Sequence, residues 1–233
     1  METYWISDDW KQQFAEAKID TLTRLLMYTE GRCLSMHSRG STFASQLPGG
    51  QIIFIKRDHF TFKKDMLPEL LHFKAPVPKT IREWRIFQGL KKLGFTVPEV
   101  IAAGFRRQFG MATVGGIVML ALEGMPLYDF IAVEPEAHRR EYAIRRCRET
   151  LESLQSQGID WPDCKAEHFM LMRNGTVGIL DLERVTFHHA PLPDKKCQKQ
   201  LNHFSTTVEH ALAANKSITP SSPDNTQNTA TVH

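Results

Sequence analysis

The chain is poor in cysteine, and its four cysteines (Cys33, Cys147, Cys164 and Cys197) are widely spaced, with no C-x-x-C pair. This pattern argues against a disulfide framework and predicts a reducing compartment. A long apolar run is also missing, because the longest, Ala112 to Leu122, has about half of the roughly 20 residues that span a bilayer. The acidic N-terminus does not resemble a secretory signal, so we expect a cytoplasmic protein.

A large excess of one charge is missing as well. The 29 lysines and arginines against 26 aspartates and glutamates give a formal net charge of +3. Dedicated nucleic-acid binders cluster basic charge far more strongly, so we predict no nucleic-acid partner. Basic residues do gather between residues 139 and 148 and between 195 and 199. They are either solvated helix faces or a surface for anionic lipid headgroups or a phosphorylated substrate, which would give peripheral membrane contact.

The pattern of the chain shows no internal repeats and divides into four parts. Residues 1–30 are predicted to be an N-terminal helical extension, because apolar residues have helical spacing over 9–30 and Gly31 follows. The other parts are a strand-rich segment with one helix (31–122), a mainly helical segment (123–215) and a polar tail predicted to be disordered (216–233). A strand-rich half before a helix-rich half predicts an α+β fold with two lobes.

Two charged residues in the strand-rich part are candidates for binding an anion. Lys56 lies near the end of a predicted buried strand, where an ammonium needs an anionic partner such as a triphosphate, or else reaches out to water. After an irregular excursion over 58–79, Glu83 lies on the next predicted helix, and Thr80 and Glu83 have the spacing of a capping box. The Glu83 carboxylate would either cap its own helix or turn inward to pair with Lys56.

The segment GIDWPDCKAEHFMLMRNGTVGILDLERV (158–185) carries most of the chemical signal. Asp163 lies in a loop after a long helix, and Asp181 ends the second strand of a hairpin with an Asn-Gly turn. The hairpin brings both loops together, so that one aspartate would accept a hydroxyl proton and the other would hold magnesium. The alternative is a turn or helix-cap role for each. A zinc site from Cys164, His168, His188 and His189 fits no compact motif.

The same residues resemble a known family. D-C-K-A-E-H at 163–168 resembles the protein-kinase catalytic loop D-x-K-x-x-N, with Lys165 at the lysine position. More narrowly, D-C-x-x-x-H-F followed by I-L-D-L-E-R-V resembles the lipopolysaccharide kinase family (Kdo/WaaP), which phosphorylates core sugars of lipopolysaccharide. F-I-K-R around Lys56 and R-E-W-R-I-F-Q-G-L-K-K-L-G-F-T-V-P-E-V around Glu83 match its small lobe. The resemblance covers residues 31 to 205 and is close to the short InaA-like members.

The resemblance implies a bilobal protein-kinase-like fold, with a small antiparallel β lobe and a truncated helical lobe. It also implies ATP and Mg²⁺ as cofactors, and a sugar hydroxyl of lipopolysaccharide core (heptose or Kdo) or of a related envelope glycolipid as acceptor. Asp163 would be the catalytic base, Lys165 would neutralise the transferring phosphoryl group, and His168 and Asp181 would face the metal. The expected nucleotide contacts are Lys56, Glu83, Arg39, Gly40, Ser41, Glu123 and Met125. We expect a monomer, in peripheral contact with the inner face of the inner membrane.

Three departures from the kinase pattern leave an alternative open. His168 replaces the usual asparagine, although the resembling sugar kinases also carry histidine there, and Trp161-Pro162 replaces the His-Arg pair before the base. The nucleotide-covering loop over 37–41 has one glycine, which predicts weaker or slower nucleotide binding. A pseudokinase that acts as a stress-response or regulatory binding module is therefore the alternative. A protein or aminoglycoside kinase ranks lower, because only about 35 residues separate Asp181 from the polar tail.

Overall fold

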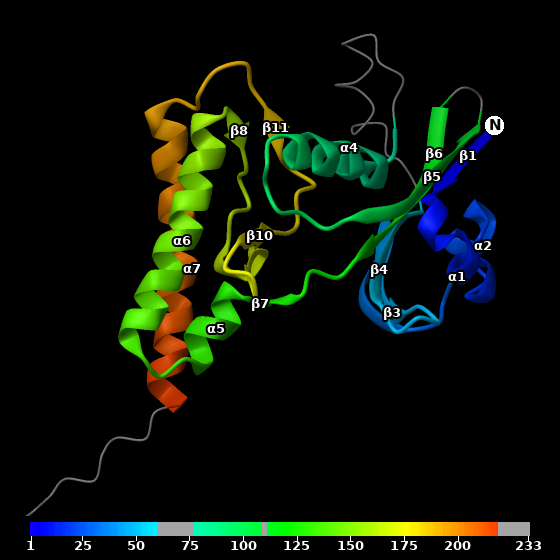
Figure 1. Cartoon of the computed structure of the whole chain (residues 1–233). Coiled ribbons are helices and arrows are strands. Elements are labelled where there is room, and N and C mark those ends of the chain that lie inside the picture. Colours follow the sequence, from blue (N-terminus) through cyan, green and yellow to red (C-terminus); the bar gives the residue numbers. More distant parts are fainter. Residues whose placement is uncertain (60–76, 109–110, 219–233) are drawn as a thin grey trace, which may run out of the picture.

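The computed structural model describes residues 1–59, 77–108 and 111–218 (Figure 1). It has two lobes, one built on a six-stranded antiparallel sheet and the other built mainly on helices. Among these residues, none of the helices combines the length and the apolar character that crossing a bilayer demands.

The sheet of the small lobe has the strand order β1-β5-β6-β4-β3-β2, and every neighbouring pair is antiparallel. A Cβ at Gly40, where the chain turns from β2 into β3, would lie 2.4 Å from the carbonyl oxygen of Arg57, so this close approach requires glycine. The predicted Pro-Gly-Gly turn before β4 is present, with Gly50 at a φ of 87°. The strands are β1 (Glu2–Ile6), β2 (Arg32–His37), β3 (Gly40–Gln46), β4 (Ile52–Asp58), β5 (Val100–Gln108) and β6 (Met111–Leu120).

Helices cover both faces of this sheet (Figure 1). On the outer face, α1 (Lys11–Glu16) and α2 (Leu22–Met27) pack through a core that includes Phe14, Leu22 and Leu25. On the inner face, α4 (Lys79–Lys92) packs through a second core that continues into the large lobe without interruption. Because α4 belongs to both the sheet and the interlobe core, its position affects any site between the lobes.

The N-terminal residues differ from the single helix predicted over 9–30. Residues 2–6 form the edge strand β1, and the helical part is divided into η1 (Asp8–Trp10), α1 and α2. The break lies at Lys18, which has a left-handed φ of 55°, and Thr21 then caps α2 by accepting a hydrogen bond from the Arg24 amide at 3.3 Å. The segment expected to be a helical extension therefore contributes both a strand and helices to the small lobe.

The start of α4 also differs from the sequence-based expectation. Most of the predicted excursion over 58–79 lies outside the described residues. The helix begins at Lys79, so Thr80 lies inside it, and the predicted capping box is wrong. Instead, Asp58 at the end of β4 accepts hydrogen bonds from the Thr80 amide at 2.7 Å and from its hydroxyl at 2.9 Å. A carboxylate from the neighbouring strand thus caps the helix, and Glu83 is not needed for that role.

The large lobe follows the prediction closely. The two strands that follow the loop containing Asp163 form a hairpin through an Asn-Gly turn, in which Gly175 has a φ of 80°. The helices are α5 (Leu127–Val133), α6 (Ala137–Ser156), η2 (Ala166–His168) and α7 (Asp194–Ile218), and the strands are β7 (Gly124–Pro126), β8 (Ile159–Asp160), β9 (Phe169–Met172), β10 (Val177–Ile179) and β11 (Thr186–Phe187). Helix α7 extends to Ile218, three residues into the tail predicted to be disordered over 216–233, and the rest of that tail lies outside the described residues.

The cysteines of this fold should differ sharply in reactivity. Cys33 is exposed, whereas Cys147 and Cys164 are buried, and burial raises the pKa of both buried thiols to about 12. Because the thiolate is the form that alkylates, iodoacetamide at about pH 8 should modify Cys33 and spare the other two until the protein unfolds. Peptide mass spectrometry of native and urea-treated protein measures this, and rapid native labelling of Cys147 would contradict the packing of α6.

Candidate active site

The pair of Lys56 and Glu83 forms the wall of the site that the small lobe contributes. The Lys56 Nζ lies 2.7 Å from Glu83 Oε1, and the side chains are 20% and 1% exposed. Burial is the largest single influence and opposes the charge of the ammonium, but the charge and hydrogen bond of Glu83, together with smaller contributions from Asp181 and Glu183, outweigh it and raise the pKa of Lys56 above its ordinary value. Burial likewise raises the pKa of Glu83, and Lys56 partly offsets that rise. Of the two roles open to Glu83, the structure shows the inward one.

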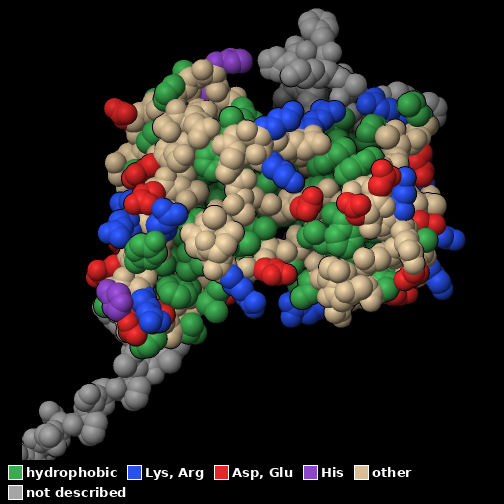
Figure 2. All heavy atoms as spheres, viewed as in Figure 1, with side chains coloured by type: hydrophobic (Ala, Val, Ile, Leu, Met, Phe, Trp, Pro, Cys, Tyr) green, Lys and Arg blue, Asp and Glu red, His purple; other side chains and the backbone are tan. Residues whose placement is uncertain are grey.

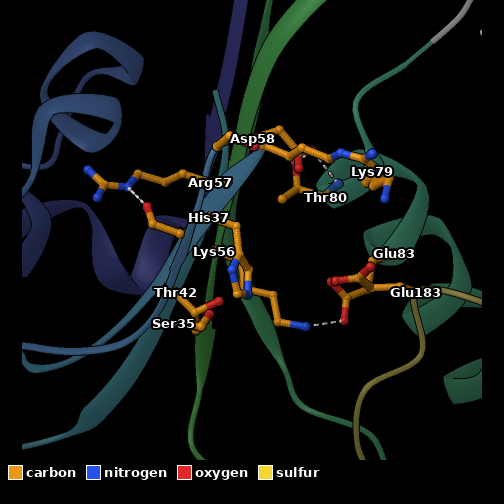
Figure 3. Close-up of a pocket in the computed structure, with 14 residues that line it drawn as sticks. Ser35, His37, Thr42, Lys56, Arg57, Asp58, Lys79, Thr80, Glu83 and Glu183 are labelled. Carbon is orange, nitrogen blue, oxygen red and sulfur yellow. Dashed lines mark hydrogen bonds and ion pairs between the residues drawn. The ribbon is translucent and has the colours of Figure 1, made fainter. Parts of the chain in front are cut away.

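A cavity of about 350 Å³ lies beside this pair (Figure 3). It is formed by the turn between β2 and β3, by β4 and by the first turn of α4, and the predicted residues Arg39, Gly40 and Ser41 line it. The Ser41 hydroxyl, however, accepts a hydrogen bond from the Arg57 guanidinium at 3.1 Å. Thr42, which is paired with Lys56 across the strands, lines the same cavity. The structure therefore adds Thr42 as a polar group opposite the lysine.

Two carboxylates line this cavity that the sequence did not indicate. Asp58 caps α4, and burial raises the pKa of its carboxyl, with the hydrogen bonds from Thr80 partly offsetting the rise. Glu183 lies two residues after Asp181 and is drawn beside Glu83 in Figure 3. Lys79, at the start of α4, adds a further cation to the lining. No local motif marks these residues, because strand, helix and loop positions that are distant in sequence bring them together.

The predicted hinge residues lie elsewhere. Glu123 and Met125 line a separate cavity of about 940 Å³, together with the turn before β4 and the end of β9. Met125 belongs to β7, which pairs with β9 and so links the hinge to the hairpin of the large lobe. The structure therefore does not bring these two residues into the cavity that holds Lys56.

The predicted base Asp163 lies beside one lysine and two histidines. Lys165 Nζ lies 3.1 Å from Asp163 Oδ1, and His203 Nε2 lies 3.8 Å from the same oxygen. Partial burial alone would raise the pKa of Asp163, but Lys165, with smaller contributions from His168 and His203, lowers it below its ordinary value. The carboxylate is thus ionised at neutral pH, as a proton acceptor must be.

His168 and Asp181 lie beside this carboxylate. One ligand atom each from Asp163, His168 and Asp181 lies within 4.8 Å of the others. His168 Nδ1 is 2.7 Å from the carbonyl oxygen of Asp163, and because a carbonyl only accepts, Nδ1 carries the hydrogen. In the neutral ring, Nε2 then keeps its lone pair, 3.6 Å from Asp181 Oδ2. The two carboxylates suit Mg²⁺ or Mn²⁺, and the imidazole, a poorer direct ligand for these ions, could contact one through a water, so these donors fit a divalent cation.

Asp181 is held in an uncommon backbone conformation by a buried tryptophan. Its φ is 54°, in the left-handed region, which aspartate tolerates better than most residues. Its carbonyl oxygen accepts a hydrogen bond from Trp161 Nε1 at 3.3 Å, and Trp161 is fully buried against Phe169. Trp161 stands where the usual kinase loop has a polar anchor, and the indole supplies that anchorage itself.

The long helix α7 supports the catalytic loop from behind. Its Gln200 carbonyl accepts a hydrogen bond from the Cys164 thiol at 3.4 Å, and its Thr207 hydroxyl accepts one from the Ala166 amide at 2.9 Å. The same helix carries His203 to Asp163. The sequence predicted the helix but gave no signal that these positions would contact the loop.

The two halves of the site face each other across the lobes. Asp181 and Glu183 lie close enough to Lys56 to raise its pKa, although Glu83 contributes more. Figure 2 shows the surface hollowed between the lobes, with acidic and basic side chains around the hollow. The strand-borne ammonium and its helix-borne partner thus lie near the loop that carries Asp181, and Asp181 lies beside Asp163, although neither aspartate lines the 350 Å³ cavity itself. Together with the lobe architecture, this defines a protein-kinase-like fold with the polar groups that phosphoryl transfer requires.

Comparisons with known proteins agree with this class. A family model described as the lipopolysaccharide kinase (Kdo/WaaP) family matches residues 49–227, which is most of the chain, and the chain belongs to this family. Family membership supports ATP as the phosphate donor. No curated protein matches the chain in sequence.

A solved structure entitled "WaaP in complex with acyl carrier protein" is similar over 94% of this chain and 90% of that chain. Its TM-score is 0.63 at 14% sequence identity. At this identity the likeness concerns the fold, and it confirms the bilobal protein-kinase-like architecture predicted from the sequence.

Proposed function

We propose that this protein is an ATP-dependent kinase that transfers the γ-phosphate to a sugar hydroxyl of lipopolysaccharide core, heptose or Kdo, or of a related envelope glycolipid. The proposal is supported by the Lys56–Glu83 pair, by the proximity of Asp181 to Lys56, and by the cluster that Asp181 forms with Asp163 and His168. Membership of a lipopolysaccharide kinase family supports the acceptor class. The family does not distinguish between the two sugars.

Each residue has a role that follows from its surroundings. Lys56, fixed by Glu83, would bind the donor phosphates, and Asp181 with His168 would hold a divalent cation that neutralises phosphate charge. Asp163 accepts the proton of the acceptor hydroxyl as the oxygen attacks the γ-phosphorus and ADP leaves, while Lys165 neutralises charge on the transferring group. Gly40 lets the covering turn approach the phosphates, and Arg39 and Ser41 belong to that turn. Glu123 and Met125 would contact the adenine only if the separate hinge cavity opens toward it.

Mass spectrometry of lipopolysaccharide from the native host tests the proposal. A strain that lacks the gene should lose one core phosphate, and the wild-type gene should restore it. Asp163→Ala should fail to restore the phosphate, whereas Asp9→Ala, which removes an exposed carboxylate on η1, should succeed. Identical phosphate content in all strains would contradict the proposed acceptor.

The single glycine of the covering turn favours a second candidate, a pseudokinase that acts as a regulatory binding module. Nucleotide binding separates the two. An active enzyme should gain about 3 kcal/mol of stability when ATP with Mg²⁺ or Mn²⁺ is present at about 100 times its Kd. A pseudokinase that binds no nucleotide would show no thermal shift, and its deletion would leave lipopolysaccharide unchanged. As part of the proposed kinase function, we also propose that the protein is a monomer in peripheral contact with the inner membrane.

A further inference from the structure

The edge strand β1 contacts the helix that carries Glu83. Trp5 of β1 stacks on Trp84 of α4, with ring centroids 5.5 Å apart and planes 19° from parallel. Trp84 directly follows Glu83 in sequence, and Trp5 is 42% exposed. Aromatic stacking of this kind stabilises a contact beyond the burial of the two rings. The stack therefore links the N-terminus of the chain to the position of the active-site carboxylate.

The alternation of β1 explains why Trp5 points toward α4. Tyr4 and Ile6 pack against the outer core with α1 and α2, so Trp5 between them faces the opposite side of the sheet. Its backbone partner on β5 is Ala103, which belongs to the core shared with α4. A small residue at 103 leaves room above the sheet, and the Trp5 indole reaches α4 across it.

The strand that carries Trp5 is firmly attached. Five residues of β1 are in register with β5, and Glu2 forms an ion pair with Arg106 at 2.9 Å. The Tyr4 hydroxyl donates a hydrogen bond to the carbonyl of Ile19 at 2.7 Å, and the Ser7 amide donates one to Ile101 at 2.9 Å. The Trp5 ring is therefore carried by a backbone that is held in place, so it can restrict the movement of the helix on which it stacks.

A second aromatic contact holds α4 from the other lobe. A Cβ at Gly89 would lie 2.9 Å from the ring of Phe187 in β11, so glycine at this position allows the ring to approach the helix closely. Phe187 belongs to the segment that follows Asp181 and Glu183. The helix that carries Glu83 is therefore contacted on one side by the N-terminal strand and, a turn and a half further along, by the segment after the metal-facing aspartate.

We propose that Trp5, through its stack on Trp84, is a positioning residue that keeps α4 in the orientation in which Glu83 meets Lys56, with Phe187 as a second contact. The inference extends the site to residue 5, outside the range 49–227 that the family model matches. The expected effect of Trp5 on nucleotide binding rests on the proposed kinase function. The effect of Trp5 on the orientation of α4 does not, and it can be tested without any substrate.

Hydrogen exchange tests the geometric claim. In Trp5→Ala, amides of α4 should exchange about tenfold faster than in the wild type, because the local opening of the helix costs less free energy. Trp5→Phe keeps a smaller ring and should lie between the two. The matched control is Trp10→Ala, which removes the same side chain from the outer core, on the face of the sheet where α1 and α2 pack. Unchanged exchange in α4, or an equal increase in Trp10→Ala, would overturn the proposal.

Nucleotide affinity provides the functional arm. Trp5→Ala should raise the Kd for ATP with divalent cation about three- to tenfold, and should add little in a Glu83→Gln background, where the pair is already lost. If Trp5→Ala lowered ATP affinity equally in the wild-type and Glu83→Gln backgrounds, Trp5 would not act through Glu83, and the proposal would be contradicted. If the wild type binds no ATP, the proposed kinase function fails, and hydrogen exchange alone then decides for or against the role of Trp5.

Discussion

Replacing Asp163 by asparagine should lower kcat by about 10²- to 10⁴-fold while leaving nucleotide affinity unchanged. The amide has nearly the shape of the carboxylate but cannot accept the hydroxyl proton. Lys56 and Glu83, which lie on the other side of the cleft, keep their contact at 2.7 Å. The measurement is initial-rate phosphorylation of purified core oligosaccharide, with ATP affinity measured in parallel on the same protein.

The variant should also remain folded. The Lys165 and His203 contacts of Asp163 involve side chains that are 37% and 40% exposed, and such ion pairs contribute about 0–1 kcal/mol. Lost activity with an unchanged melting temperature would therefore identify a chemical role. Asp9→Asn, which neutralises an exposed carboxylate far along the chain, is the matched control. Activity within tenfold of the wild type would show that another group accepts the proton.

The large lobe could be predicted from the sequence because its signals are local. The hairpin depends on an Asn-Gly turn, in which Gly175 adopts the positive φ that glycine favours, and α6 ends before Gly158, with a φ of 74°, for the same reason. Apolar residues at helical spacing then define α6 and α7 without knowledge of the rest of the chain. The proximity of Asp163 and Asp181 could be predicted as well, because they lie before and after this hairpin and a hairpin brings its two ends together.

The N-terminal part could not be predicted in the same way, because its strand pairs with residues about a hundred positions away. Glu2 to Ile6 contain no turn signal, and their partner β5 starts at Val100. Helical spacing over 9–30 was a real pattern, but the left-handed conformation at Lys18 interrupts it. The extra strand is visible only after the sheet has been assembled.

The role of Glu83 shows how a long-range contact overrides a local motif. Thr80 and Glu83 have capping-box spacing, and a cap would have turned the carboxylate toward its own helix. Asp58 takes both hydrogen-bond donors of Thr80, so Glu83 is free to pair with Lys56. The sequence supplied both alternatives for Glu83, and only the position of Asp58 decides between them.

Trp161 shows the opposite case, in which an apparent departure turns out to stabilise the site. Trp161-Pro162 departs from the His-Arg pair that precedes the base in the usual kinase pattern. In the structure the indole is fully buried and donates a hydrogen bond to the Asp181 carbonyl, so one residue joins the two loops. Burial of a large side chain is a property of the assembled core, which the pattern around residue 161 does not reveal.

Lys56→Met should destabilise the protein by about 3 kcal/mol near neutral pH and abolish nucleotide binding. Removing one partner of a buried pair leaves the other charge uncompensated, which costs about 3–5 kcal/mol, and the partial exposure of Lys56 puts the loss at the lower end. Without the ammonium, the pKa of Glu83, already raised by burial, rises further. Urea unfolding at several pH values measures the effect.

The sign of the pH dependence follows from that raised pKa. In the variant, folded Glu83 binds its proton more tightly than the unfolded chain does, because the carboxyl of the unfolded chain titrates at about 4.3. The variant therefore gains stability relative to the wild type as the pH falls from the raised pKa of folded Glu83 toward about 4.3. Lys56→Met combined with Glu83→Gln leaves no buried charge at this pair, so it should recover most of the stability and lose this pH dependence while still failing to bind ATP. A deficit that is the same at every pH, or that persists in the double variant, would show that Glu83 is not held by the charge of Lys56.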